Sequence, residues 1–274
     1  MTGRPRAKRS LGQNFLVDQS VIRRIVDAAG VTEGDTVLEI GPGRGALTHQ
    51  LRARAAHFIC IEKDDALAAE HARSFADDDQ AHVVHGDALK AMPEELPTPG
   101  PYRIVANLPY NMAARITLHL LESWGTDVSA MTLMYQAEVA DRIVGRPGSK
   151  SYGSLSVQIA NFCEGWRLFS VPGGAFRPVP KVLSAVVRLR RRPVTLCEER
   201  GVDYQWLRLV VRGAFQSRRK TMINSLRLAP ALSSDVKVLA AAIEAAGIPE
   251  GTRADSVTPR QFVALASLLN PIAG

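Results

Sequence analysis

The stretch VLEIGPGRGALT, residues 37–48, decides the fold that this sequence predicts. An apolar run ends at Glu39, glycines follow at positions 41, 43 and 45, and a helical stretch comes next. Glycines at the carboxyl end of a strand let a ligand approach the backbone, and the following helix presents unpaired N–H groups. The stretch therefore predicts a ligand site after the first strand of an α/β sheet. Tight turns also require glycine, so the loop alone is equally consistent with a structural role.

Short apolar runs alternate with helical stretches through the first half of the chain. This alternation is typical of a mainly parallel sheet that carries helices on both faces. A helix is expected over residues 64–75, because two aspartates open it and Leu67, His71 and Phe75 follow at helical spacing. The expected strands are residues 36–40, 58–61, 82–85, 103–106 and 131–134.

The second half of the chain changes to an expected hairpin and then to helices. Two extended runs, 167–172 and 184–190, flank a Gly/Pro-rich stretch and are expected to pair at the sheet edge. Apolar residues then recur at helical spacing, and Thr258-Pro259 is expected to begin the last helix. The fold class is therefore α/β with a small all-helical C-terminal domain. We expect a sheet domain over residues 1–192, a linker over 193–203 and a helical domain over 204–274.

The composition is that of an ordinary folded chain. Of its 274 residues, 46% are hydrophobic and 22% charged, which argues against a disordered or fibrous protein. No apolar run approaches the roughly 18 residues of a membrane-spanning helix, and the basic N-terminus leads into no apolar signal segment. We therefore expect a cytoplasmic protein. Cys60, Cys163 and Cys197 lie far apart without a Cys-x-x-Cys pair, so we expect buried thiols and neither disulfides nor a metal site.

The positive charge of the chain is concentrated in three segments. Lys and Arg number 34 against 27 Asp and Glu, a formal net charge of +7. Residues 1–9, 188–192 and 204–234 are basic and contain no Asp or Glu. Such segregation costs self-repulsion unless a polyanion binds, and nucleic acid is the commonest one. One cluster alone would be read as a solvated surface, but three favour a nucleic-acid partner.

Acidic residues stand at the ends of the next two expected strands. Glu62 lies about 20 residues past the glycine loop, where a carboxylate can accept hydrogen bonds from ribose hydroxyls. Asp87 follows the third strand and can accept a hydrogen bond from an adenine amino group. Either residue alone is equally well explained as a helix N-cap. Together with the glycine loop they predict a nucleoside site, because ligands of open α/β sheets bind at these strand ends.

The sequence Asn107-Leu108-Pro109-Tyr110 after the fourth strand predicts the reaction. Pro109 lacks an N–H and holds Leu108 extended, so the turn presents carbonyl groups. An exocyclic amine on a base is a poor nucleophile, because its lone pair is delocalised into the ring. If Asn107 Oδ1 and the Leu108 carbonyl accept its two hydrogens, that lone pair is freed. Tyr110 would stack on the base and hold it in line with an electrophile; the alternative is a proline turn with a buried tyrosine.

Six motifs together resemble one family over nearly the whole chain. They are RSLGQNFL, EIGPGRGALT, IEKD, GDAL, NLPYN and FRPVPKVLSAV, in this order. The chain resembles the ribosomal RNA adenine N6-dimethyltransferases, in particular the small-subunit type. The resemblance implies a Rossmann-like methyltransferase sheet of about seven strands, S-adenosylmethionine as methyl donor, and dimethylation of two adjacent adenosines near the 3′ end of small-subunit rRNA. The cofactor-binding residues that it implies are Asn14, Leu16, Gly41, Glu62, Asp87 and Asn107.

The resemblance also assigns residues around the target base and the RNA. Gln13 and Phe15 fit a lid over the cofactor or the base. Phe176, in a stiff Gly/Pro-rich loop, is expected opposite Tyr110, against the open face of the base. Leu183 departs from the family, which usually has an acidic residue there. The residues expected to contact RNA phosphates are Arg218, Arg219 and Lys220.

The expected partner is small-subunit rRNA within the immature small ribosomal subunit, and a single basic face favours a monomer. No metal is expected. No strong base is expected either, because the amine proton becomes acidic once the nitrogen is alkylated. Two other functions are consistent with these motifs. A resistance methyltransferase that acts on large-subunit rRNA would share the cofactor loop and an Asn-x-Pro-Tyr/Phe turn. A ribosome assembly factor would mainly bind the particle, with methylation secondary.

Overall fold

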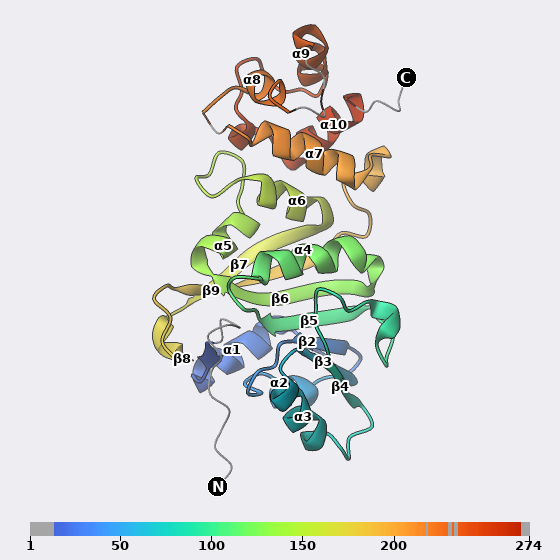
Figure 1. The fold of residues 1–274 in the computed structure, drawn as a ribbon, viewed down its shortest axis with the longest axis vertical. Helices are drawn as coiled ribbons and strands as arrows, with labels where there is room; N and C mark the ends of the chain where they lie inside the picture. Colours follow the sequence, from blue (N-terminus) through green and yellow to red (C-terminus); the bar gives the residue numbers. More distant parts are fainter. Residues whose placement is uncertain (1–13, 218, 230–231, 233–234, 270–274) are drawn as a thin grey trace. The chain divides into compact units, whose positions relative to one another are not determined.

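The computed structural model describes residues 14–217, 219–229, 232 and 235–269. Its main sheet has seven strands in the order β4-β3-β2-β5-β6-β9-β7 (Figure 1). A separate two-stranded ladder joins β1 to β8. The strands are β1 Phe15–Leu16, β2 Thr36–Ile40, β3 His57–Glu62, β4 Ala81–His85, β5 Tyr102–Asn107, β6 Val128–Gln136, β7 Cys163–Val171, β8 Phe176–Arg177 and β9 Ser184–Arg191.

The order of the strands places a ligand crevice at β2. Its neighbours are β3 on one side and β5 on the other, both parallel to it. β4 continues parallel beyond β3, and β6 beyond β5, whereas β9 runs antiparallel to β6. The order of the strands therefore reverses at β2, and the carboxyl ends of β2, β3, β4 and β5 share one edge. Ligands of open α/β sheets bind at such a switch point.

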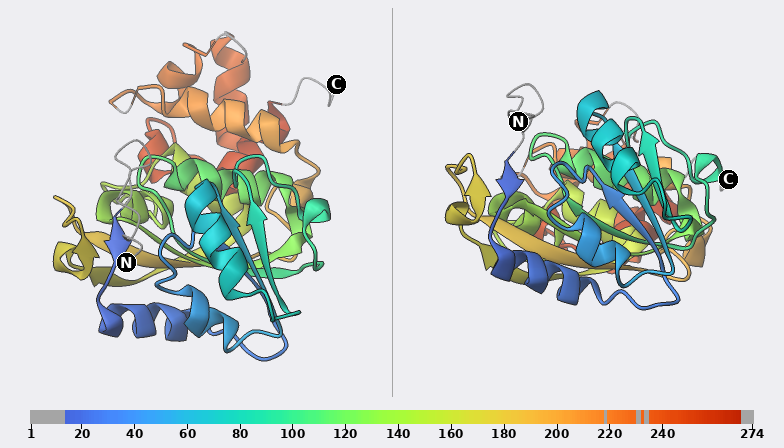
Figure 2. Two further views of the ribbon diagram at one scale, coloured as in Figure 1. Left: turned by 60° about the horizontal axis from the view of Figure 1, so that its bottom comes forward. Right: turned by 90° about the horizontal axis from the view of Figure 1, so that it is seen from below.

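Helices cover both faces of the sheet (Figure 2). On one face, Val37, Val105 and Met134 belong to one buried cluster with apolar residues of α1 and α2. Tyr135 points to the opposite face, where its hydroxyl lies 2.8 Å from Thr117 Oγ1 of α4. The α-helices are α1 Gln19–Ala29, α2 Thr48–Arg52, α3 Asp65–Ser74, α4 Ala113–Ser123, α5 Ala137–Ile143, α6 Ser154–Phe162, α7 Tyr204–Ala214, α8 Met222–Leu226, α9 Val236–Ala245 and α10 Pro259–Leu268.

The strands and helices expected from the sequence are confirmed. β2 has the expected bounds, and β3 to β6 contain the expected runs and extend beyond them. The two runs of the expected hairpin become β7 and β9, which are neighbours at the edge of the sheet. Asp64 caps α3, since its Oδ1 accepts from Ala66 N at 3.0 Å and from Leu67 N at 3.2 Å. Thr258 likewise caps α10, with Pro259 in its first turn.

The chain forms two compact units whose limits differ from the predicted domains. Residues 141–164 and those from Arg192 onward group together, whereas 165–191 return to the sheet unit. The expected sheet domain of residues 1–192 therefore includes a segment that packs with the C-terminal helices. Val157 of α6 shares one buried cluster with Leu207 of α7 and Phe262 of α10. Helical spacing alone does not show which core the apolar side chains of α6 face.

The expected linker over residues 193–203 is part of the helical unit. Leu196 and Cys197 are each 3% exposed and belong to the buried cluster of that unit. Cys197 N also donates to Asn161 Oδ1 at 2.9 Å. The stretch carries many polar residues, but the side chains of Leu196 and Cys197 are buried and anchor it in the core of the helical unit. All three cysteines, Cys60, Cys163 and Cys197, are buried, as expected. Among the described residues, each helix is too short or too polar to cross a lipid bilayer.

Candidate active site

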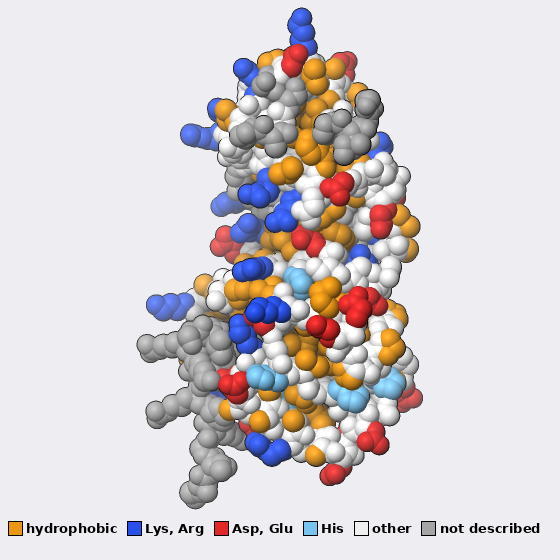
Figure 3. Space-filling model, turned by 45° about the vertical axis from the view of Figure 1, so that its right-hand side comes forward, with side chains coloured by type: hydrophobic (Ala, Val, Ile, Leu, Met, Phe, Trp, Pro, Cys, Tyr) orange, Lys and Arg blue, Asp and Glu red, His pale blue; other side chains and the backbone are white. Residues whose placement is uncertain are grey.

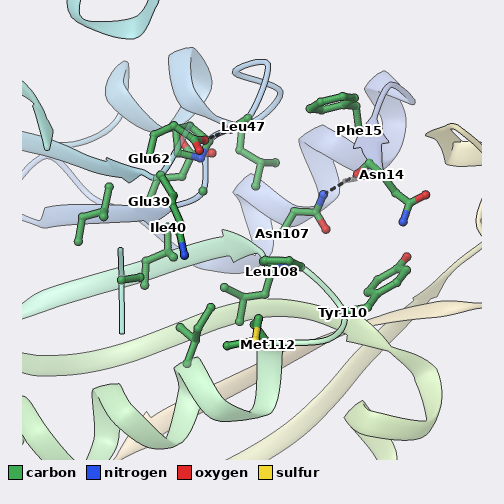
Figure 4. Close-up of a pocket in the computed structure, with 18 of the residues that line it drawn as sticks. Asn14, Phe15, Glu39, Ile40, Leu47, Glu62, Asn107, Leu108, Tyr110 and Met112 are labelled. Carbon is green, nitrogen blue, oxygen red and sulfur yellow. Dashed lines mark hydrogen bonds between the residues drawn. The ribbon is translucent and has the colours of Figure 1, made fainter. Parts of the chain in front are cut away.

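A cavity of about 310 Å³ lies at the carboxyl ends of β2 to β5 (Figure 4). It is lined by residues from 14–16, 39–47, 61–63, 86–89 and 107–116. Every residue expected to bind the cofactor lines it, as do Leu108 and Tyr110 of the expected catalytic set. Segments far apart in sequence therefore meet at the predicted edge of the sheet.

The glycine loop adopts a conformation that requires glycine. Gly41, Gly43 and Gly45 have φ angles of 64°, 57° and 77°, a left-handed region that side chains disfavour. Gly43 N donates to Glu62 Oε2 at 3.0 Å, and Asp64 N donates to Glu62 Oε1 at 2.9 Å. Glu62 is thus fixed at the end of β3 and ties the glycine loop to the next strand.

Glu39 is a buried acid that lines the same cavity. Its carboxyl accepts a hydrogen bond from Thr48 Oγ1 at 2.7 Å. Burial raises the pKa of Glu39 to about 8; the Thr48 hydrogen bond opposes this rise and the neighbouring Glu62 carboxylate adds to it. At neutral pH the Glu39 carboxyl therefore mostly keeps its proton. Sequence reasoning treated this residue only as the end of a strand.

Asp87 is held at the rim of the cavity by two donors. Lys63 Nζ lies 2.8 Å from Asp87 Oδ2, and Leu89 N donates to Oδ1 at 3.0 Å. The hydrogen bond from Lys63 lowers the pKa of Asp87 further below neutrality, and the Leu89 amide acts in the same direction. Asp87 is therefore an ionised acceptor with lone pairs left for a ligand amine. Lys63 lines the cavity as well, although no feature of the sequence assigned it a role.

Asn107 ends β5 with its side-chain amide in a defined orientation. Its Nδ2 donates to the backbone oxygen of Asn14 at 3.3 Å, so Oδ1 is the end left to accept (Figure 4). The Tyr110 hydroxyl lies 2.6 Å from Ser184 Oγ, at the start of β9. Burial raises the pKa of Tyr110, so the phenol is neutral. Asn107 thus presents an amide oxygen, and Tyr110 a ring that is tethered at its hydroxyl.

The structure contradicts the expected position of Phe176. Its side chain is fully buried in the cluster that includes Val171 and Val186, and it is not among the residues that line the cavity. The chain pairs Leu16 with Phe176 in the short β1–β8 ladder, and the apolar ring turns into the core. Phe15 lines the cavity instead and is the second aromatic ring there. Gln13 lies outside the described residues.

The basic segments predicted to meet a polyanion differ in their surroundings. Arg191 Nη1 donates to the Leu121 carbonyl at 3.2 Å, and Arg192 pairs with Glu164 at 3.5 Å. The 188–192 segment therefore serves contacts within the chain rather than a free basic face. Arg219 and Lys220 are exposed in the turn between α7 and α8. Arg218 and the basic residues of 1–9 lie outside the described part of the chain.

Comparison with known sequences gives one consistent result. Residues 4–270 match the family described as ribosomal RNA adenine dimethylase. A protein of Acinetobacter baylyi named ribosomal RNA small subunit methyltransferase A is 41% identical over 97% of this chain and 93% of its own length. A protein of the same name from Enterococcus faecalis is 43% identical over 80% of this chain and 75% of its own length.

Solved structures show the same architecture. A crystal structure of the 23S rRNA methyltransferase ErmE aligns with a TM-score of 0.70 at 29% identity, covering 94% of this chain and all of that one. A dimethyladenosine transferase from Plasmodium falciparum aligns with a TM-score of 0.75 at 23% identity, covering 92% of this chain and 95% of that one. At that identity the second likeness concerns the fold alone.

Proposed function

This chain belongs to the ribosomal RNA adenine dimethylase family, and we propose that it dimethylates N6 of two adjacent adenosines in the 3′-terminal hairpin of small-subunit rRNA. It is a methyltransferase whose methyl donor is S-adenosylmethionine. The relatives named for the small subunit support this choice of substrate. The observation that carries the proposal is the Asn107 amide, whose nitrogen is engaged by Asn14 so that its oxygen is the acceptor at the cavity.

The residues at the strand ends fit the methyl donor. Glu62 and Asp87 supply carboxylate oxygens for a ribose and an adenine amino group, and Gly41 gives the ligand close access to the backbone. Asn14 and Leu16 lie far from the glycine loop in sequence but line the same cavity. When bound, S-adenosylmethionine supplies an electrophilic methyl group on a positively charged sulfur. Carboxyl groups lining the cavity suit that positive charge.

Asn107 and Leu108 act on the target amine. Asn107 Oδ1 and the Leu108 carbonyl accept the two N6 hydrogens, which draws the nitrogen toward tetrahedral geometry and frees its lone pair. Tyr110 stacks on the flipped adenine, and its bond to Ser184 limits the rotation of the ring. The amine loses its proton to water after alkylation, so no side chain has to act as a strong base. Phe15 is placed to contact the bound ligands from β1.

The RNA is bound by charge and shape. Arg219 and Lys220 contact phosphates, together with Arg218, and position the hairpin without reading its bases. The partner is the immature small ribosomal subunit, on which the protein acts as a monomer in the cytoplasm. Figure 3 shows Lys and Arg side chains on one face of the molecule, among Asp and Glu side chains.

The test is transfer of labelled methyl groups from S-adenosylmethionine to three substrates. These are small subunits that lack the modification, large subunits, and free rRNA, and each product is digested to nucleosides. Label in dimethyladenosine from small subunits alone is the expected result. The likeness to ErmE makes the large subunit the second candidate substrate, and label there alone would replace the proposal. Tight particle binding without label would indicate an assembly factor.

A further inference from the structure

His71 lies against the glycine loop but comes from α3, none of whose residues lines the cavity. Its side chain is buried, and its Nε2 lies 2.9 Å from the carbonyl oxygen of Gly43. A carbonyl oxygen can only accept, so Nε2 carries the proton and donates it to this bond. We infer that His71 is a positioning residue, which holds the glycine loop in the conformation that binds the methyl donor.

Both polar backbone groups of Gly43 are held by side chains. Its N–H donates to Glu62 Oε2 at 3.0 Å, and its carbonyl accepts from His71. Glycine has many backbone conformations of similar energy, so this residue alone does not fix its φ at the observed 57°. Glu62 and His71 come from different elements, the end of β3 and the buried side of α3. Their hydrogen bonds to the N–H and the carbonyl of Gly43 therefore hold its backbone in this one conformation.

The bond from His71 also orients the next peptide group. Because a trans peptide is planar, the N–H of Arg44 points opposite to the carbonyl of Gly43. Gly43 and Arg44 both line the cavity, whereas His71 does not. The carbonyl therefore turns toward α3 and the N–H toward the other side. Rotation of this peptide would break the hydrogen bond to His71 and change the backbone that lines the cavity at Gly43 and Arg44.

Aromatic rings support the loop at two points. A Cβ added at Gly45 would lie 3.2 Å from His71 Cε1, so the imidazole ring fills the space below that glycine. A Cβ added at Gly43 would lie 3.4 Å from Phe15 Cε1. Arg44 in turn places its guanidinium carbon 4.2 Å from the centre of the Phe15 ring. The loop is therefore fixed by His71 through a hydrogen bond and by ring packing.

This role concerns affinity for the methyl donor and not the transfer step. It depends on S-adenosylmethionine binding alone, so it would hold even if the proposed RNA substrate were wrong. The experiment measures the dissociation constant of S-adenosylmethionine by titration calorimetry with the full-length chain, without RNA. Three variants are compared with the wild type: His71→Leu, His71→Gln, and Arg73→Gln, an exposed change on the same helix.

His71→Leu removes the donor and is expected to weaken binding about five- to tenfold, the effect of one lost hydrogen bond. His71→Gln carries an N–H at similar reach and is expected to stay within about twofold of the wild type, as is Arg73→Gln. In turnover, His71→Leu should raise KM for the donor while kcat at saturation is kept. Wild-type affinity in the folded His71→Leu protein would overturn the inference. So would a folded His71→Gln protein that binds the donor as weakly as the leucine variant. If the leucine variant does not fold, a folded His71→Gln protein that binds the donor about five- to tenfold more weakly than the wild type overturns the inference.

Discussion

Asn107 receives its orientation from a backbone atom 93 residues earlier in the chain, the carbonyl oxygen of Asn14. The sequence predicts that Asn107 supplies an acceptor, because an amide beside a proline turn can offer one. It does not predict which end of the amide faces the ligand, since that depends on a contact between distant segments. The same holds for Lys63 and Ser184, whose partners Asp87 and Tyr110 are reached only in the folded chain.

Asn107→Ala is expected to lower kcat for methyl transfer about 100- to 1000-fold, the loss typical of removing one acceptor that acts in the transition state. Affinity for S-adenosylmethionine should stay within about fivefold, because Glu62, Asp87 and the glycine loop are unchanged. Single-turnover rates and titration calorimetry measure the two quantities separately. A variant that turns over at the wild-type rate would remove Asn107 from the mechanism.

Glu39 makes the stability of the protein depend on pH. Its pKa is raised from 4.5 to about 8, mainly by burial, so folding favours the protonated form. The stabilising contribution of this proton is complete below about pH 4.5 and is lost as the pH rises through 8. Glu39→Gln keeps an acceptor for Thr48 without the charge. The free energy of unfolding of this variant should therefore rise relative to the wild type between pH 5 and 8, by on the order of 3 kcal/mol.

Urea denaturation at several pH values measures that difference. Glu33→Gln, a change at an exposed glutamate, is the control and should leave the pH dependence unchanged. Parallel pH profiles of the wild type and Glu39→Gln would show that the buried carboxyl does not titrate between pH 5 and 8.

At the scale of elements, apolar patterning predicts β2 to β6 and the two edge strands, but neither the short β1–β8 ladder nor the core that each helix faces. β2 to β6 were expected because short apolar runs bounded by turns read as strands. Phe176 was misplaced, since a Gly/Pro-rich loop reads as exposed although its aromatic ring completes a core. Phe15 was foreseen as a lid by resemblance and lines the cavity. The grouping of α6 with the helical unit depends on tertiary contacts that its spacing does not contain.

Gly213, in α7, marks a close approach inside the helical unit. A Cβ there would lie 2.9 Å from Ala229 Cβ and 3.1 Å from Leu232 Cδ1. Gly213→Val is therefore expected to destabilise the protein by about 2–3 kcal/mol through overpacking. Thermal denaturation measures the loss. Gly34→Val, the same change at an exposed glycine whose Cβ would meet nothing within 4 Å, is the matched control and should cost less than about 0.5 kcal/mol. Equal stability of the two variants would contradict the close packing of α7.

At the scale of the whole molecule, the net charge of +7 predicts a polyanionic partner, but not which basic residues meet it. Three segments looked alike in sequence. The structure separates two of them, because the arginines of 188–192 contact carbonyls, a carboxylate and a tryptophan ring, whereas residues 1–9 lie outside its described part. Arg219 and Lys220 are exposed and remain candidates for phosphate contacts. Local charge counts cannot make this distinction, since it depends on the neighbours that folding brings.

The double variant Arg219→Gln and Lys220→Gln should weaken binding to small subunits and lower the slope of log affinity against log salt by about 1.5, for two lost phosphate contacts. Affinity for S-adenosylmethionine should not change. Filter binding over a range of salt concentrations measures the slope, with Lys237→Gln, an exposed change on α9, as the control. An unchanged slope would exclude these two side chains from the RNA interface.

The central claim is that the cavity at the end of β2 carries dimethylation of adenine N6 in small-subunit rRNA. Mass spectrometry of the isolated 3′-terminal hairpin, after reaction of unmodified small subunits with the purified protein, tests it most directly. The account predicts four added methyl groups, two on each of two adjacent adenosines, and none with the Asn107→Ala variant over the same time. Methyl groups on another base or another atom, or equal modification by that variant, would contradict the claim.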